Sequence, residues 1–443
     1  MDTIWDIIVI GGGPAGMMAA GRAAERAREQ GREIKILLLE KNDSLGKKLL
    51  ITGGGRCNVT NAEFDDRALL AKFKDSSKFL FSAFAQHNVR KTLSFFNTRG
   101  METKVEAEKR VFPVSDKAQS VWDVMVSYLT ATSKDGRPSM VTIGSDSPVT
   151  GFVQTKPGII DGVKIAAAPS ESEEIVRGKA FIIATGGKSH PETGSTGEGF
   201  AWLAKAGHTI IEPTAALVPI NVSDVWVKSL AGVSLPEAKL TLFLDGVKVT
   251  GKGGKKAVKK GKVLFTHFGM SGPAILNMSA EIGELLQYGE VVLSLDLLPE
   301  HDYATLNEAL QRLFAVESNK KFKNAITSLI PTAFVPVIVE RSGISPDIAC
   351  NSVTREERLK LVKLLKDLHI HPTGLLGDDK AIITSGGVAL EEVDFRTMQS
   401  RRIQNLYLVG DVLNIDRPSG GYSLQLCWTT GWVAGSSAAE AVA

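Results

Sequence analysis

The stretch that most constrains the fold lies at the start of the chain, where β-branched residues lead directly into a cluster of glycines. Residues 7–10 read Ile-Ile-Val-Ile, a pattern typical of a buried strand in a parallel sheet. Gly11, Gly13 and Gly16 follow in the G-x-G-x-x-G spacing, which serves a tight turn, close approach of backbone to a pyrophosphate, and close packing of helix against strand. Pro14 suits the first turn of the helix that this spacing predicts.

A second strand and an acidic residue complete this pattern. Residues 34–39 are mostly aliphatic and predict a strand, and Glu40 follows it directly. A carboxylate in that place can accept hydrogen bonds from both hydroxyls of a ribose. The N-terminus of the intervening helix supplies free N–H groups and partial positive charge for phosphates. Together these features predict a dinucleotide site, whereas a glycine-rich turn alone would be weak evidence.

The composition excludes several classes of protein. A chain of 443 residues is long enough for roughly three domains of about 150 residues. Its net charge of +3 is too small by itself to indicate nucleic-acid binding. The sequence has no apolar run of ~20 residues, no signal-peptide pattern and no C-x-x-C motif among Cys57, Cys350 and Cys427. We therefore expect a cytoplasmic α/β protein with reduced cysteines, no membrane contact and no metal site.

A second glycine-rich segment, residues 41–61, follows Glu40. The three successive glycines at 53–55 allow backbone to pass close to a flat or phosphorylated ligand. Lys48 and Arg56 carry positive charge that can offset the charge of phosphate. A solvated basic loop is the alternative, but the position directly after the ribose-type acid favours contact with the ligand.

The middle of the chain predicts an insertion into the nucleotide-binding domain. Residues 62–135 look mostly helical, residues 140–180 predict short strands joined by turns, and a buried strand then ends in the small residues Thr185, Gly186 and Gly187. From about residue 212 the sequence alternates as in β-strands, and residues 301–368 favour helices. We expect one domain formed by residues 1–205 and 369–443, interrupted by a β-rich and partly helical domain at 206–368.

The end of the chain favours a flavin over a nicotinamide. Residues 406–411 predict a buried strand that ends in Gly410 and Asp411, and Gly421 precedes an apolar helix rich in small residues. The aspartate can accept a hydrogen bond from a ribityl hydroxyl. A helix beginning near Ser423 would direct its N-terminus at the pyrimidine ring of a flavin. Because a nicotinamide dehydrogenase would complete its site within the adjoining half-sheet, these residues favour FAD.

Four strings in the sequence resemble one bacterial family. They are residues 51–61 (Ile-Thr-Gly-Gly-Gly-Arg-Cys-Asn-Val-Thr-Asn), 184–187 with 194–197, 265–273 (Phe-Thr-His-Phe-Gly-Met-Ser-Gly-Pro) and the Gly-Gly-Tyr run at 420–422. Over nearly its whole length the chain is similar to the BaiN-like, or aminoacetone-oxidase-family, FAD-binding flavoproteins. The resemblance implies a discontinuous, glutathione-reductase-like Rossmann domain that binds FAD non-covalently, interrupted by a β-barrel-like domain with a helical portion.

The resemblance also implies which residues contact the cofactor. Carried over by position, they are Gly11, Gly13, Pro14, Ala15, Gly16, Glu40, Lys41, Lys48, Gly53, Gly54, Gly55, Arg56, Cys57, Asn58, Thr185, Gly186, Gly187, Gly410, Asp411, Gly421, Tyr422, Ser423 and Leu424. Four positions depart from the family pattern, because Asp411, Asn414, Arg417 and Ser423 stand where Glu, Asp, Gly and Asn are usual. Asp411 keeps the hydrogen bond with a shorter reach, and the other three departures leave the substrate open.

The sequence also offers candidates for the electron donor and for the catalytic residues. The sequence has no second strand–G-x-G-x-x-G–helix unit, so NAD(P)H as an electron donor would bind transiently. The absence of C-x-x-C argues against a disulfide reductase. His267 is the first candidate for a general acid and His190 the second, with a structural role as the alternative for each.

Three functions fit these observations. The first is an FAD-dependent oxidoreductase, linked to NAD(P)H, that reduces an activated double bond or oxidises an amine or alcohol of a small molecule. The second is a flavoenzyme that reduces uridine in ribosomal RNA, an activity attached to relatives, with the lysine-rich run Lys252–Lys262 holding phosphates. That run would otherwise be a solvated hairpin tip. The third is a non-catalytic flavin-binding protein. None of these predicts an oligomeric state.

Overall fold

The computed structural model describes residues 3–132, 136, 138–166, 173–250, 258–377 and 383–443. The chain divides into two compact units, of which the first comprises residues 1–215 and 381–443 and the second comprises residues 216–380. These borders lie about ten residues later than the domain borders expected from the sequence. The difference arises because β10 (Ile210–Ala216) pairs with β19 (Ile383–Val388), while strands β17 (Leu368–Ile370) and β18 (Pro372–Leu375) belong to the sheet of the second unit.

The first unit is built on a sheet that is parallel at its centre, which confirms the predicted α/β class. The strand order is β6-β2-β1-β9-β8-β7, with β20 also paired to β9. Strands β6, β2, β1, β9 and β20 run parallel, and β7 and β8 form an antiparallel extension. Their bounds are β1 Ile4–Ile10, β2 Ile36–Leu39, β6 Val141–Gly144, β7 Val149–Val153, β8 Gly162–Ile165, β9 Glu174–Ile183 and β20 Leu406–Leu408.

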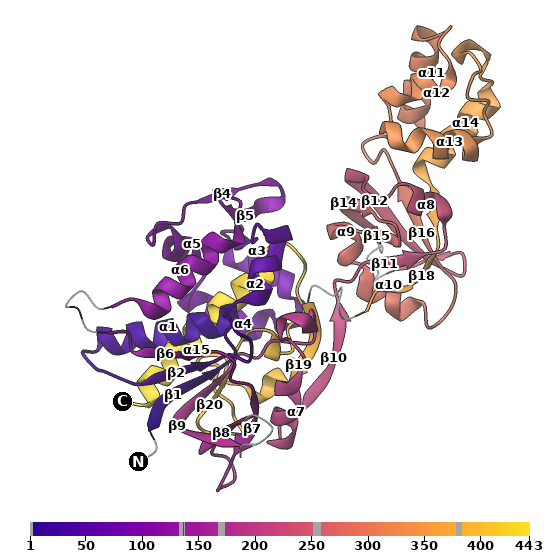
Figure 1. Cartoon of the computed structure of the whole chain (residues 1–443). Coiled ribbons are helices and arrows are strands. Elements are labelled where there is room, and N and C mark those ends of the chain that lie inside the picture. The colour runs from indigo at the N-terminus through magenta and orange to yellow at the C-terminus, as the bar shows by residue number, and fades with distance from the viewer. Residues whose placement is uncertain (1–2, 133–135, 137, 167–172, 251–257, 378–382) are drawn as a thin grey trace. The chain divides into compact units, whose positions relative to one another are not determined.

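Two helices from opposite ends of the sequence lie against each other over this sheet. Helix α1 (Pro14–Glu29) follows β1, and α15 (Tyr422–Ala441) packs beside it (Figure 1). Glycine permits this close approach, because a Cβ at Gly431 would lie 2.5 Å from the carbonyl oxygen of Ala15 and one at Gly435 would lie 2.3 Å from that of Ala19. The helix that follows the first strand, α1, therefore packs closely against α15.

Shorter elements surround this core. The segment expected to be mostly helical contains helices but also a small antiparallel sheet in which β5 lies between β3 and β4. The remaining elements of the first unit are α2 Lys47–Ile51, β3 Thr60–Asn61, α3 Asp66–Leu70, α4 Ser77–Gln86, α5 Val89–Asn97, β4 Thr103–Val105, β5 Arg110–Pro113, α6 Ala118–Thr130 and α7 Glu198–Lys205. Among the residues that the structure describes, no helix has both the length and the apolar character needed to cross a bilayer.

The second unit combines an antiparallel sheet with a group of helices (Figure 1). The strand order is β17-β16-β12-β14-β15-β11-β18, with β13 on β12. Strand bounds are β11 Ile220–Val222, β12 Ser234–Leu244, β13 Val247–Lys248, β14 Val258–Phe265, β15 Gly269–Ser271 and β16 Val291–Asp296. Helix bounds are α8 Val225–Ser229, α9 Pro273–Leu276, α10 Ser279–Leu285, α11 Tyr303–Val316, α12 Phe322–Ala325, α13 Val335–Ser342 and α14 Arg355–Lys366. The buried apolar residues of these strands and helices form a hydrophobic core distinct from that of the first unit.

Candidate cofactor site

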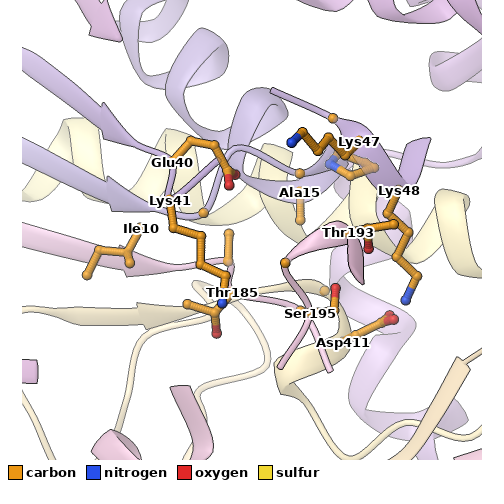
Figure 2. A pocket seen from close by; sticks show the side chains of 18 of the residues that line it. Ile10, Ala15, Glu40, Lys41, Lys47, Lys48, Thr185, Thr193, Ser195 and Asp411 are labelled. Carbon is orange, nitrogen blue, oxygen red and sulfur yellow. The ribbon is translucent and has the colours of Figure 1, made fainter. Parts of the chain in front are cut away.

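A pocket lies at the carboxyl ends of the parallel strands of the first unit, the usual place for a ligand in such a sheet. Ile10, Leu39 and Ala184 line it where strands β1, β2 and β9 end. Figure 2 shows Ile10 among the side chains that line the pocket. The predicted cofactor residues that line it are Gly11, Gly13, Pro14, Ala15, Glu40, Lys41, Lys48, Thr185, Gly186, Gly410, Asp411, Ser423 and Leu424. Tertiary packing therefore brings five separate segments of the chain, 11–15, 40–48, 185–186, 410–411 and 423–424, around one pocket.

The glycine turn after β1 has the shape that a phosphate group needs. Gly11 has φ +104°, and a Cβ there would lie 2.4 Å from the carbonyl oxygen of Ala184. A Cβ at Gly16 would lie 1.9 Å from the carbonyl oxygen of Gly11, so this glycine lets helix and turn touch. Among the residues that the structure describes, none has an atom within 4 Å of a Cβ placed at Gly13, and no side chain caps the helix that Gly13 begins. The first turn of α1 thus offers free N–H groups to an open space.

Glu40 lines the pocket beside the glycine turn and is held in place there by three hydrogen bonds. Its Oε2 accepts a hydrogen bond from the Gly12 backbone N–H at 2.8 Å. Its Oε1 accepts two from Asn42, from the backbone N–H at 2.9 Å and from the side-chain amide at 2.7 Å. A carboxylate offers about four acceptor positions, so one remains for a ligand hydroxyl. The carboxylate therefore fixes the glycine turn as well as facing the pocket.

The loop after β9 forms a wall that the candidate residues did not include. Residues Thr193–Glu198 line the pocket, and Lys41 reaches across to donate to Thr196 Oγ1 at 2.8 Å and to pair with Glu198 at 3.1 Å. The Asn42 amide also donates to the Thr193 carbonyl oxygen at 3.0 Å. The signal for this wall was the run of small polar residues at 194–199. Other lining residues that the sequence did not indicate are Ser147, Val149, Trp202 and Cys427.

The opposite end of the pocket carries a group of charged and polar side chains around Asp411. Lys48 donates to Ser189 Oγ at 2.6 Å, and burial lowers the pKa of its ammonium group while Asp411 opposes that shift. The guanidinium of Arg417 is buried and bonds to Asp411, to Ser423 Oγ at 2.9 Å and to the Ile415 carbonyl oxygen at 2.7 Å. Arg417 is thus joined to two lining residues, a role that the sequence did not suggest.

Several predicted cofactor residues do not line the pocket. These are Gly16, Gly53, Gly54, Gly55, Arg56, Cys57, Asn58, Gly187, Gly421 and Tyr422. Arg56 pairs with Glu106 and Asp116 and lies over the Phe112 ring at 4.1 Å. Burial raises the pKa of the Cys57 thiol to about 12, which leaves it protonated at neutral pH. Their neighbour Thr52, however, does line the pocket, so this segment borders the site.

The two candidate general acids lie in different units. His190 adopts φ +56° in the loop that leads to Thr193, and its Nδ1 lies 2.8 Å from Glu192 Oε1. The His190 backbone carbonyl accepts a hydrogen bond from Thr193 Oγ1 at 2.7 Å, which ties it to the pocket-lining loop. His267 lies in the turn between β14 and β15 of the second unit, with its ring 5.1 Å from that of Phe268.

Only part of the lysine-rich run can be placed. Residues 251–257 lie outside the described residues, whereas Lys259, Lys260 and Lys262 are exposed on β14. Lys239 of β12 is the register partner of Lys260. The second unit therefore presents several lysines on two neighbouring strands.

The lining residues fit FAD. The open space beside Gly13 and the uncapped N-terminus of α1 suit the pyrophosphate, and Glu40 suits a ribose. Thr185 Oγ1 is buried without a hydrogen-bond partner among the described residues and is free to bond a ligand. The first turn of α15, at Ser423, brings a second helix N-terminus to the far end of the same pocket.

Comparisons with known proteins identify the family of the chain. The family described as HI0933-like protein Rossmann domain matches residues 5–437. The chain is 28% identical over 432 residues to the ribosomal RNA dihydrouridine synthase of Escherichia coli strain K12, covering 97% of this chain and 96% of that protein. It is 29% identical over 436 residues to the 3-dehydro-bile acid delta(4,6)-reductase of Clostridium scindens, covering 98% of both.

A solved structure shares the fold. The 3-ketosteroid delta1-dehydrogenase of Sterolibacterium denitrificans matches with a TM-score of 0.51 and 12% identity, over 99% of this chain and 100% of that one. At this identity the likeness concerns architecture alone. The family match, by contrast, spans nearly the entire sequence. The chain therefore belongs to the HI0933-like family of FAD-binding Rossmann proteins and is an FAD-dependent oxidoreductase of the BaiN-like kind.

Proposed function

We propose that this oxidoreductase accepts hydride from NAD(P)H and delivers it, through non-covalently held FAD, to an activated carbon–carbon double bond of a small molecule. The first turn of α15 carries this proposal, because it reaches the pocket at Ser423 and Leu424 and no side chain in the described part of the chain caps it. Its N–H groups and partial positive charge favour the negative charge that develops when a flavin is reduced. When bound there, FAD would supply the hydride chemistry.

The names of two relatives support reduction as the direction of the reaction. One names a dihydrouridine as product, and the other names a reductase. Oxidation of a small amine or alcohol would use the same pocket in the opposite direction. A non-catalytic flavin-binding role would need the pocket but no electron donor.

In this proposal the residues of the chain bind FAD, orient it and protonate the substrate. Gly13 and the first turn of α1 hold the pyrophosphate, Glu40 holds the adenosine ribose, and Asp411 orients the ribityl chain. A proton reaches the substrate from a histidine. His267 is the first candidate for this proton donor and His190 is the second, and Glu192 orients the ring of His190.

Non-covalent attachment is supported by the state of the pocket-lining thiol. Burial raises the pKa of Cys427 to about 12, so the thiol stays protonated at neutral pH and is a poor nucleophile. Acid precipitation of the purified protein should release free FAD into the supernatant, where absorbance and mass spectrometry identify it. Flavin that stays with the precipitated protein would contradict non-covalent binding.

Ribosomal RNA is the second candidate substrate, and the exposed lysines of the second unit favour it. Lys259, Lys260 and Lys262 on β14 can neutralise phosphates, and such binding weakens steeply with salt. Replacing these three lysines by Gln should abolish RNA binding if RNA is the substrate. The same change should leave reduction of a small enone unaltered if the substrate is a small molecule.

Anaerobic reduction is the first test of the whole proposal. The purified protein is mixed with NADH or NADPH, and the flavin absorbance is followed in a stopped-flow instrument. Rapid bleaching supports a reductase and leads to a direct comparison of a conjugated steroid enone with ribosomal RNA as oxidants. No bleaching by either nucleotide, with bleaching by an amine or alcohol, would replace the proposal with an oxidase. Bleaching only by dithionite would favour the non-catalytic role.

A further inference from the structure

Arg417 is buried behind the pocket wall and not in it. Its side chain has no exposed surface, and it lies in the segment between β20 and α15. The guanidinium donates to the Ile415 carbonyl oxygen at 2.7 Å, to Ser423 Oγ at 2.9 Å and to Asp411 Oδ1. Asp411 and Ser423 line the pocket, whereas Arg417 does not. Any effect of Arg417 on a bound flavin therefore passes through these two neighbours and through its charge.

The charge of Arg417 offsets a carboxylate that faces the cofactor site. A guanidinium stays protonated at every ordinary pH, so the Arg417–Asp411 pair has no net charge while both groups are ionised. Lys48 and Cys427 also face Asp411, and Glu192 lies further out with its side chain 58% exposed. Removing Arg417 alone would leave the partly buried Asp411 carboxylate with only the Lys48 ammonium to offset it, and burial lowers the pKa of that ammonium. A negative charge in such a place is costly where water screens it poorly.

Reduction adds negative charge to a flavin, so the charge of this wall bears directly on the reduction equilibrium. A nearby uncompensated carboxylate disfavours the reduced form, and a nearby uncompensated cation favours it. Ser423 adds a geometric element, since it stands in the first turn of α15, whose N-terminal N–H groups face the same end of the pocket. One guanidinium thus holds both the carboxylate and the helix terminus.

We propose that Arg417 is a positioning residue that locks Asp411 and Ser423 at the pocket wall and, by offsetting the charge of Asp411, raises the reduction potential of the bound FAD. This inference rests on the proposed function in requiring FAD to lie with its ring near α15. It assigns a task to a side chain that touches neither cofactor nor substrate.

The test measures the midpoint potential of the holoenzyme in four variants by dye equilibration. R417Q should disfavour reduction at least tenfold, which is about 30 mV for a two-electron couple. D411N should shift the potential in the opposite direction, and the double variant D411N/R417Q should return close to wild type because both charges are gone. R417K, which keeps the charge, should stay near wild type. R402Q removes an exposed arginine of the same unit and is the matched control.

The outcomes separate this inference from the function on which it rests. R417Q with the wild-type potential, or a double variant shifted as far as R417Q, would overturn the electrostatic role. An R417Q variant that loses its FAD, together with an R417K variant that retains FAD at the wild-type potential, supports the proposal. If both variants lose their FAD, the role of Arg417 is packing alone. A wild-type protein that NAD(P)H reduces, with variants of unchanged potential, leaves the proposed function standing. A wild-type protein that NAD(P)H cannot reduce sinks that function whatever the potentials are.

Discussion

The carboxylate of Glu40 accepts a hydrogen bond from the backbone N–H of Gly12 at 2.8 Å. These residues stand at the ends of two adjacent parallel strands, β2 and β1. The bond joins the acid that we propose holds a ribose to the glycine turn that we propose holds the phosphates. It fixes the position of Glu40 relative to that turn, and the two Asn42 hydrogen bonds to Glu40 reinforce it.

Replacing Glu40 by Gln should weaken FAD binding. An amide can accept on one side only, so its NH₂ group would face the N–H of either Gly12 or Asn42. Because hydrogen bonds to a charged group contribute about 1.5–3 kcal/mol, we expect the Kd for FAD to rise about 10- to 100-fold. Fluorescence titration of the apoprotein with FAD measures this change. E440Q, which alters an exposed acid on α15, is the control, and equal affinity in E40Q and E440Q would contradict the role of Glu40.

Alanine at Gly13 should weaken FAD binding, whereas alanine at Gly16 should lower the stability of the fold. Gly13 has φ −76°, which alanine tolerates, and its Cβ would enter open space, so G13A should fold with stability changed by no more than about 0.5 kcal/mol. That Cβ would occupy the space assigned to the pyrophosphate, and we expect the FAD Kd to rise at least about tenfold. In G16A the new Cβ would lie 1.9 Å from the Gly11 carbonyl oxygen, so this variant should be strongly destabilised.

Thermal unfolding of the two apoproteins and FAD titration distinguish these effects. G13A that binds FAD as tightly as wild type would place the phosphates elsewhere.

The buried thiols should resist alkylation and disulfide exchange in the native protein. Burial raises the pKa of Cys57 and of Cys427 to about 12, and a raised pKa lowers the thiolate fraction at neutral pH. Relative to an ordinary thiol of pKa ~8.5, the thiolate fraction at pH 7.5 falls roughly a thousandfold. Ellman's reagent should therefore react fully with the three cysteines only in guanidinium chloride. Rapid native reaction at Cys57 would reopen a redox role for that thiol.

His87 should make the protein sensitive to mild acid. It is buried with its ring stacked on Trp432 at 4.5 Å, and neither ring nitrogen has a hydrogen-bond partner among the described residues. Burial lowers the pKa of His87 to about 3, whereas the unfolded chain titrates near 6.5. Between pH 6.5 and pH 3, His87 binds a proton in the unfolded state but not in the folded state. The free energy of unfolding is therefore undiminished by His87 above pH 6.5 and falls as the pH drops towards 3.

At pH 5 this linkage amounts to about 2 kcal/mol of unfolding free energy. H87F keeps an aromatic ring and cannot be protonated, so it should lose correspondingly less stability between pH 7.5 and pH 5. Urea denaturation at the two pH values gives the comparison, and H301F, which alters a more exposed histidine in the second unit, is the control. Equal losses in wild type and H87F would show that His87 titrates normally.

Much of the pocket lining could be predicted because its signals are local. The glycine spacing, the strand before it and the acid after the next strand each depend on a few consecutive residues, and Ile10, Gly11, Gly13 and Glu40 from these segments line one pocket. The run at 194–199 carries a pattern, but the sequence does not show that it folds back onto the pocket, and the single residues Ser147 and Trp202 carry no distinctive pattern. Arg56 looked like a phosphate ligand, but its nearest carboxylates, Glu106 and Asp116, come from residues that only folding brings near.

The sequence by itself determined the nature of the first unit and its cofactor, because backbone conformation at Gly11 to Gly16 and strand burial are short-range properties. Only the tertiary structure decided the partners of the charged side chains. Arg417 could have faced solvent or substrate, and it is instead buried against Asp411 and Ser423. A long side chain has many rotamers and reaches several places, so its partner depends on which groups the completed fold leaves within reach and shielded from water.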